Sequence, residues 1–128
     1  MPTIRTIAII DDDESIRIGL RFLVTALGYN AFAFASAADF LQSDQFRGTS
    51  CVISDVRMPA MSGIQLQAHL RNTGCEIPII LITAVPEGSV RQQALDDGAV
   101  AFLTKPLDDH ALSSYLENAV SRSLRAER

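Results

Sequence analysis

The sequence has few of the residues that mark secreted, zinc-binding or membrane-spanning proteins. Its two cysteines, Cys51 and Cys75, match neither a disulfide framework nor the ligand spacing of a zinc site. Aliphatic runs such as Ile79 to Ile82 are far shorter than the roughly 20 apolar residues that cross a bilayer. The segment from Met1 to Ile10 has too short an apolar core for a signal peptide. We therefore expect a cytoplasmic protein with reduced thiols and no membrane contact.

Positive charge is also scarce. The chain has 11 Lys plus Arg against 15 Asp plus Glu, a formal net charge of −4. Proteins that grip nucleic acid or anionic membranes need a basic field, so this composition excludes a general binder of either kind. With 128 residues, of which 48% are hydrophobic, the chain has the size and composition of one domain with its own core.

Short apolar runs alternate with segments of helical period, which is typical of repeated βα units around a parallel sheet. The predicted strands are Ile4–Ile10, Asn30–Ala35, Cys51–Ser54, Pro78–Thr83 and Ala99–Thr104. The fold class is therefore α/β, a single doubly wound domain with five parallel strands. In such folds ligands bind beyond the carboxyl ends of the strands, where the strand order reverses.

The helices between these strands are marked by their ends. The first is predicted over Ile16–Leu27 and stops at Gly28, while Ser36 and Ser62 have capping-box spacing to Asp39 and Gln65 and open the second and third. The fourth is expected from Glu87 to Asp97 as the least apolar, loosely held helix, and the fifth from Asp109 to about Val120. The polar segment from Ser121 to Arg128 is expected to be a fraying end or a linker.

Four carboxylates, Asp11 to Glu14, directly follow the first strand. Clustered carboxylates repel one another unless a cation or proton relieves the repulsion. The alternative is that one or two of them, such as Asp13, cap the following helix. Asp55 ends the third strand, which flanks the same switch point, so Asp12 and Asp55 are placed to supply two oxygen ligands to Mg²⁺.

Two further polar residues stand at strand ends. Thr83 closes the fourth strand and Lys105 follows the fifth. Taken alone, Thr83 is a turn hydroxyl and Lys105 a surface lysine. Together with the carboxylates they predict a phosphoryl-transfer site, in which an ionised Asp55 attacks phosphorus while a metal and the ammonium neutralise the transferred oxygens.

At this point the sequence resembles the receiver domains of bacterial two-component response regulators, from about Ile4 to Val120. The matching pieces are Ile9-Ile10-Asp11-Asp12-Asp13-Glu14, Asp55-Val56-Arg57-Met58-Pro59 followed by Ser62-Gly63, Thr83-Ala84, Gly98-Ala99 and Phe102-Leu103-Thr104-Lys105-Pro106. The resemblance implies a flavodoxin-like (βα)5 sheet of strand order 2-1-3-4-5. It implies a receiver domain over residues 1–120, with 121–128 as a polar tail or a linker to an absent C-terminal output domain.

The resemblance also implies roles for the acidic residues. Asp55 would accept a phosphoryl group from the phosphohistidine of a sensor histidine kinase. Mg²⁺ would be bound by Asp12, by Asp55 and by the backbone carbonyl of Arg57, with Asp11 acting through water. The protein would be a phosphoacceptor switch that assists its own phosphotransfer and dephosphorylation, rather than an enzyme.

Three residues near the last strand receive roles from the same resemblance. Lys105 would pair with the phosphoryl oxygens, and its bond to Pro106 is expected to be cis. Thr83 and Phe102 match the family's switch pair, in which the threonine moves toward the phosphoryl group and the ring turns inward from an outward rotamer. The surface of the fourth helix, fifth strand and fifth helix would change as a result.

The segments around Met61-Ser62-Gly63 and from Ala101 to Asp109 are most similar to the FixJ-type subgroup. Its members usually carry a C-terminal helix-turn-helix domain, so transcription control and DNA binding would belong to that absent part. Dimerisation on phosphorylation is a further expectation from the family. Arg57 departs from the amide or carboxylate that is commoner at its position in the family. The resemblance therefore implies no particular lifetime for the phosphoryl group.

Two alternatives stay open from the sequence. The first is a haloacid-dehalogenase-like phosphatase with Asp11 as nucleophile, loosely echoed by Asp13, Thr83, Lys105 and the pair Asp108-Asp109. The second is a receiver-like interaction module that is never phosphorylated. His69 and His110 are isolated and are expected to be surface residues rather than phosphocarriers.

Overall fold

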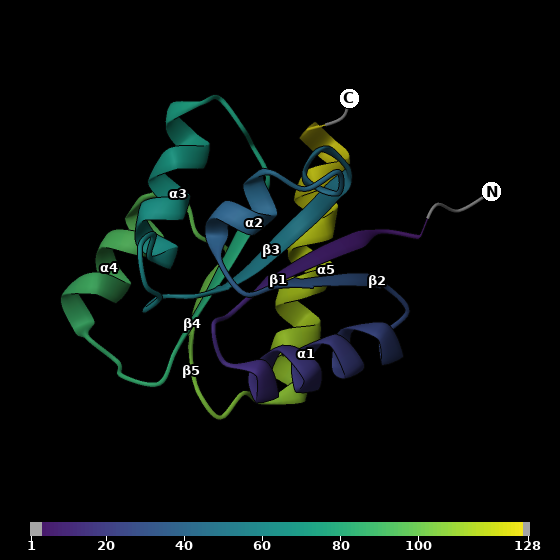
Figure 1. The fold of residues 1–128 in the computed structure, drawn as a ribbon, viewed down its shortest axis with the longest axis horizontal. Helices are drawn as coiled ribbons and strands as arrows, with labels where there is room; N and C mark the ends of the chain where they lie inside the picture. The colour runs from purple at the N-terminus through teal and green to yellow at the C-terminus, as the bar shows by residue number, and fades with distance from the viewer. Residues whose placement is uncertain (1–3, 127–128) are drawn as a thin grey trace.

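A computed structural model describes residues 4–126 of the chain. It contains one sheet of five parallel strands in the order β2-β1-β3-β4-β5, so the predicted fold class and strand order are confirmed (Figure 1). The elements are β1 (Thr6–Ile10), α1 (Glu14–Ala26), β2 (Asn30–Phe34), α2 (Ala37–Leu41), a 3-10 turn (Phe46–Gly48), β3 (Thr49–Asp55), α3 (Gly63–Asn72), β4 (Ile79–Thr83), α4 (Gly88–Asp96), β5 (Ala101–Thr104) and α5 (Asp109–Ala126).

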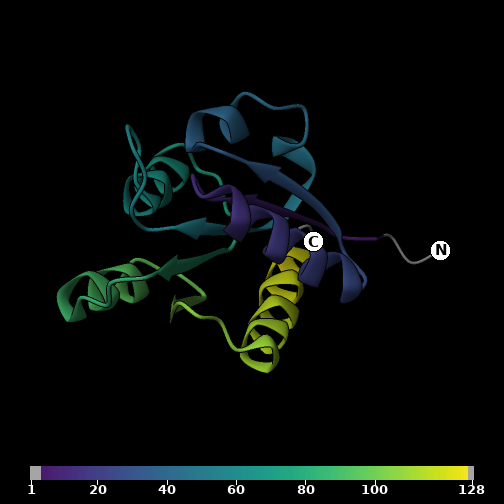
Figure 2. The same ribbon diagram turned by 60° about the horizontal axis from the view of Figure 1, so that its bottom comes forward.

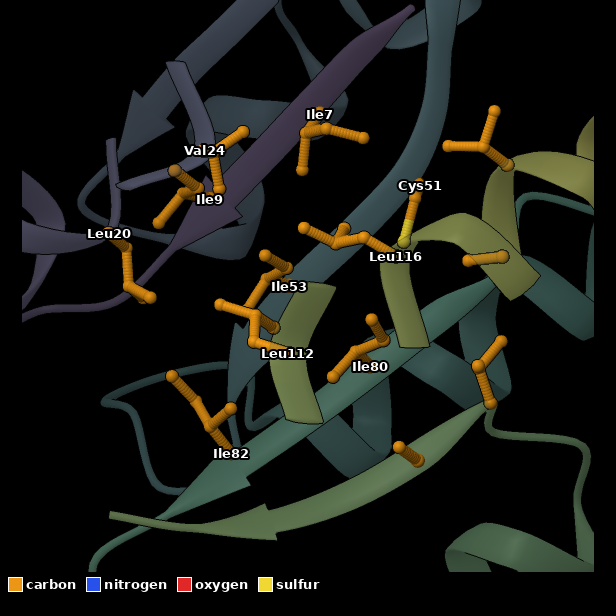
Figure 3. Packing of buried hydrophobic residues seen from close by; sticks show 14 of the residues in the cluster. Ile7, Ile9, Leu20, Val24, Cys51, Ile53, Ile80, Ile82, Leu112 and Leu116 are labelled. Carbon is orange, nitrogen blue, oxygen red and sulfur yellow. The ribbon is translucent and has the colours of Figure 1, made fainter. Parts of the chain in front are cut away.

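The sheet is covered on both faces. Because successive strand residues point to opposite faces, Ile7 and Ile9 of β1 pack toward α1 and α5, whereas Ala8 and Ile10 pack toward α2, α3 and α4. Figure 2 shows α2 and α5 on opposite sides of the sheet. In the cluster on the α1 and α5 side, Leu112 and Leu116 of α5 meet the isoleucines of β1, β3 and β4 (Figure 3).

The strands end close to where the sequence predicts, and β3 is the longest of them. It runs from Thr49 to Asp55, extending the predicted Cys51–Ser54 at both ends, and every residue in it is buried. Asp55 is itself a strand residue, paired in register with Ile82 of β4. The phosphoacceptor candidate is therefore fixed by the central strand rather than by a mobile loop.

The predicted helix starts are present. The Ser62 side chain accepts the N–H of Gln65, and the Gln65 side chain accepts the N–H of Ser62, which completes a capping box for α3. Ser36 accepts the N–H of Asp39 at the start of α2. Gly28 follows α1 with φ 102°, a left-handed conformation that glycine adopts without strain.

The fifth helix is longer than the sequence analysis expected. Instead of ending near Val120, α5 continues through the polar segment to Ala126. This segment contains arginine, leucine and alanine, which favour helix, and no glycine or proline that would stop it. Residues 127 and 128 of the predicted tail lie outside the described residues. Within the described part of the chain, no helix has the length and hydropathy to cross a membrane.

Candidate functional site

Three carboxylates meet at the carboxyl edge of the sheet. Asp11 and Asp12 follow β1, and Asp55 ends the adjacent strand β3, so parallel pairing brings them together. One carboxylate oxygen from each of the three lies within 4.8 Å of the others. Asp11 and Asp55 are buried while Asp12 is exposed. The arrangement is a cup of hard oxygen ligands with one side open to solvent, which suits Mg²⁺ with its retained waters.

Lys105 reaches into the same cup from the loop after β5. Its Nζ lies 3.0 Å from Asp11 Oδ2 and 3.7 Å from Asp55 Oδ1. The Lys105–Pro106 bond is cis, as expected. Since Lys105 and Asp11 are far apart in sequence, only the folded sheet places the ammonium beside the carboxylates. The lysine is thus a cation held at the point where negative charge gathers.

Hydrogen bonds within the acidic run show which carboxylate caps α1. Asp13 caps α1: its Oδ1 accepts the N–H groups of Ser15 at 2.9 Å and Ile16 at 3.4 Å. Asp11 Oδ1 accepts the N–H of Asp13 at 2.9 Å. Capping and cation binding are therefore not alternatives in this run, because Asp13 supplies the first while Asp11 and Asp12 are left for the second.

The environment of Asp55 raises the pKa of its carboxyl. Burial raises the pKa of the Asp55 carboxyl above its ordinary value, and the negative charge of Asp11 raises it further. The Lys105 ammonium and a hydrogen bond from the backbone N–H of Arg57 act in the opposite direction without cancelling the rise. The single ammonium of Lys105 thus offsets only part of the negative charge of the three carboxylates.

This electrostatic excess has a measurable effect on stability. Between the ordinary pKa of aspartate and the raised pKa of Asp55, the folded state binds more protons than the unfolded state, so the contribution of Asp55 to stability falls as pH rises. We expect Asp55→Asn to increase the free energy of unfolding at neutral pH, and the difference from wild type to disappear in acid, below about pH 4. Urea titrations across this range, with exposed Asp44→Asn as the control, measure both effects; a difference independent of pH contradicts the assignment.

Thr83 and Phe102, the two residues that the resemblance implies as a switch pair, are both buried. Thr83 is buried at the end of β4, and its Oγ1 donates to the carbonyl and accepts the N–H of Val85, both at 3.1 Å. Phe102 is also buried, with 7% of its surface exposed, rather than turned outward. Its ring packs in the cluster with α3 and α4, where a pocket beside the loop after β3 gives it room.

The structure adds Arg17, which the sequence did not single out, and gives Gly63 a packing role. Arg17 of α1 donates from Nη1 to the backbone carbonyl of Asp11 at 2.8 Å, which fixes the loop that carries the acidic pair. Gly63 opens α3 against β3: a Cβ added there would lie 3.1 Å from the carbonyl carbon of Asp55 and closer to its oxygen. Arg17 carries no local sequence signal, whereas the Ser62-Gly63 dipeptide at a helix start was visible.

The histidines and cysteines lie outside this site. His69 and His110 are both exposed, as expected. Cys51 and Cys75 are free, and Cys51 is buried in β3. Asp108 lies just before α5 and accepts the N–H of His110 at 3.3 Å, a contact at the N-terminal end of that helix. The geometry therefore gives no support to the acidic pair required by the haloacid-dehalogenase alternative.

Comparison with known proteins places this geometry in a family. The chain matches the response regulator receiver domain family over residues 7–117. It is 34% identical over 123 residues to the transcriptional regulatory protein FixJ of Bradyrhizobium diazoefficiens, covering 96% of this chain and 60% of the relative. It is 38% identical over 114 residues to nodulation protein W of the same organism, covering 89% of this chain and 50% of that protein.

A solved structure agrees with these matches. The crystal structure of FixJ-N aligns with a TM-score of 0.83 and 32% identity, covering 94% of this chain and 96% of that one. The chain spans about half to three fifths of the length of the curated relatives. The match thus extends over the sheet and the acidic cup alike. The chain belongs to the response regulator receiver domain family.

Proposed function

We propose that this domain accepts a phosphoryl group on Asp55 from the phosphohistidine of a sensor histidine kinase, in a reaction that requires Mg²⁺. The observation that carries the proposal is the convergence of three carboxylates within 4.8 Å, with the Lys105 ammonium 3.0 Å from one and 3.7 Å from another. A helix cap needs none of this, because Asp13 already performs that role. The signal would pass through α4, β5 and α5 to an output domain that controls transcription.

The donor set fits magnesium. Asp12 and Asp55 would hold the ion with the backbone carbonyl of Arg57, and Asp11 would contact it through water. When bound, Mg²⁺ would neutralise charge on the carboxylates and on the oxygens of the transferred group. The open side at exposed Asp12 leaves room for the waters that this ion retains.

The chain's own residues account for the transfer. An oxygen of ionised Asp55 attacks phosphorus, the P–N bond of the phosphohistidine breaks, and its electron pair stays on the imidazole nitrogen. Lys105 is positioned to pair with the phosphoryl oxygens once Asp55 no longer carries its charge. The Thr83 hydroxyl would exchange its bond to Val85 for one to a phosphoryl oxygen. That exchange would loosen the loop between β4 and α4.

An apolar surface beside the cup supports a protein donor. Ile18 and Phe22 of α1 are 59% and 79% exposed, which is unusual for residues of this size. Phe22 lines a groove together with Lys105 and Pro106, so this surface reaches the rim of the site. A kinase that delivers a phosphoryl group to Asp55 must cover this rim, and we place its docking surface on α1.

The test uses acetyl phosphate as a small donor. With Mg²⁺ present, intact-mass measurement should find the mass of one added phosphoryl group, stable in acid and lost in alkali, as expected for an acyl phosphate. Chelation of Mg²⁺ should prevent the addition. A chain whose mass does not change under these conditions would instead support the interaction module that is never phosphorylated.

The metal assignment gives a separate prediction. Mg²⁺ affinity should be weak and should fall at least about tenfold in Asp12→Ala, since loss of an outer-sphere partner alone typically lowers metal affinity 10- to 100-fold. The matched control is Asp13→Ser, which also removes one negative charge from the run but keeps a helix-capping hydroxyl. Isothermal titration of both variants checks this; equal losses in the two would mean that only the overall charge matters.

A further inference from the structure

Helix α4 is held to its neighbours by few apolar side chains, of which Val90 and Leu95 are only partly buried, and by polar contacts. Ala94 is its one buried residue, and it lies on the side that faces α3. Gln67 of α3 donates from Nε2 to the carbonyl of Ala94 at 3.0 Å, a buried bond. Arg71 of α3 pairs with Asp97, the C-cap of α4, at 3.1 Å. The buried hydrogen bond holds the C-terminal half of α4 on α3, to which the partly exposed ion pair adds little, and the two helices lie side by side (Figure 1).

The N-terminal end of α4 is held differently. Glu87 is the N-cap residue, but its side chain makes no capping hydrogen bond. Its carboxylate instead forms an ion pair with Arg57 in the loop after β3. Both side chains are about half exposed, at 57% and 44%, so water and salt screen the pair and it contributes little to stability. A stronger anion near Arg57 would displace Glu87.

Arg57 stands where such an anion would form. It follows the phosphoacceptor candidate Asp55 by two residues, and its backbone N–H is bonded to the Asp55 carboxyl. Arg57 and Glu87 both line a pocket of about 520 Å³ that Phe102 also lines. The ion pair therefore connects the phosphorylation loop to α4 beside the ring of the switch pair.

We propose that Arg57 couples phosphorylation to α4 by exchanging partners: its guanidinium leaves Glu87 for the phosphoryl group on Asp55 and so releases the N-terminal end of the helix. The proposal rests on the proposed function of Asp55. A phosphoryl group carries about −1.5 to −2 charge, and arginine pairs with phosphate oxygens more strongly than with one exposed carboxylate. The buried hydrogen bond at Ala94 keeps the C-terminal half in place, so α4 pivots rather than detaches.

Hydrogen exchange with beryllofluoride, a stable phosphoryl mimic, tests this exchange of partners. In wild type, the mimic should speed amide exchange in residues 88–91, the first turn of α4, by about two- to fivefold, the factor expected for loss of an exposed ion pair. Glu87→Gln should show the faster exchange in residues 88–91 without the mimic and should change no further there when it is added, whereas the loop of residues 84–87 should still respond through Thr83. Exchange near Asp97 should stay constant in both proteins.

Two controls separate the partner exchange of Arg57 from a general effect of removing a carboxylate and from failure of the mimic to bind. Glu76→Gln removes an exposed carboxylate from the loop before β4 and should behave as wild type. Fluorine NMR of bound beryllofluoride reports separately on the site. Bound beryllofluoride with unchanged exchange in residues 88–91 of wild type, or a full response of these residues in Glu87→Gln, overturns the partner exchange of Arg57 alone. Absence of bound beryllofluoride in wild type overturns both the proposed function of Asp55 and the partner exchange of Arg57.

Discussion

An Asp55→Asn variant should gain no phosphoryl group from acetyl phosphate and Mg²⁺, under conditions in which wild type gains one. The carboxamide keeps the size of the side chain but replaces the charged nucleophilic oxygen that attacks phosphorus. Asp55 lies in the central strand β3, so the substitution leaves the sheet register and the surrounding elements in place. Because the charge at this position opposes folding, the variant should also be at least as stable as wild type at neutral pH. A failure of the variant to gain the phosphoryl group could then not be attributed to unfolding.

Asp11→Asn separates this assignment from the phosphatase alternative. If Asp55 is the acceptor, Asp11→Asn should still form an adduct, more slowly, because Lys105 loses its 3.0 Å partner and the metal loses a water-mediated contact. Peptide mapping should place that adduct on Asp55. The alternative requires the reverse: turnover of a generic phosphate ester abolished in Asp11→Asn and unaffected in Asp55→Asn. Intact mass and phosphate release, measured on both variants, decide between the two.

Gly63→Ala should be the most damaging single-methyl change near the site. The new Cβ would meet the Asp55 carbonyl carbon at 3.1 Å and Leu81 Cδ2 at 2.9 Å, and the strand backbone cannot move without breaking its pairing with β4. Overpacking of this kind lowers the free energy of unfolding by about 3 kcal/mol. The displaced Asp55 should also accept phosphoryl groups more slowly, by roughly 100-fold for a shift of 1 Å.

Gly19→Ala is the matched control, because it adds the same methyl group inside α1 where nothing lies within 4 Å. Alanine favours helix over glycine, so this variant should be more stable than wild type by about 0.5–1 kcal/mol. The chain has no tryptophan, so urea unfolding is best followed by circular dichroism. Equal free energies of unfolding for the two variants would mean that the contact between Gly63 and Asp55 is not restrictive.

The layout of the fold was predictable because buried parallel strands leave a plain sequence pattern. The runs around Ile7 and Ile80 are aliphatic on both faces, and glycines such as Gly28 end the helices between them. The end of α5 was not predictable from polarity, because a polar segment made of good helix formers can extend a helix instead of ending it. That is why the helix passes Val120 and runs to Ala126.

The site was predictable to the extent that topology determines it. Residues at the carboxyl ends of parallel strands lie at one edge of the sheet, so Asp12, Asp55 and Lys105 could be grouped from the sequence alone. The ion pair of Arg57 with Glu87 depends on how two loops pass each other, and no local pattern encodes it. The buried position of Phe102 depends on the space left by α4, which a sequence reading cannot measure.

The pairing of Lys105 with Asp11 joins residues 94 positions apart. A polypeptide emerging from the ribosome therefore presents its carboxylates well before the ammonium that balances them can arrive. A domain without β5 and the loop after it would have no Lys105 ammonium beside Asp11. The charge balance at this edge of the sheet is therefore complete only when the whole domain has been synthesised and folded.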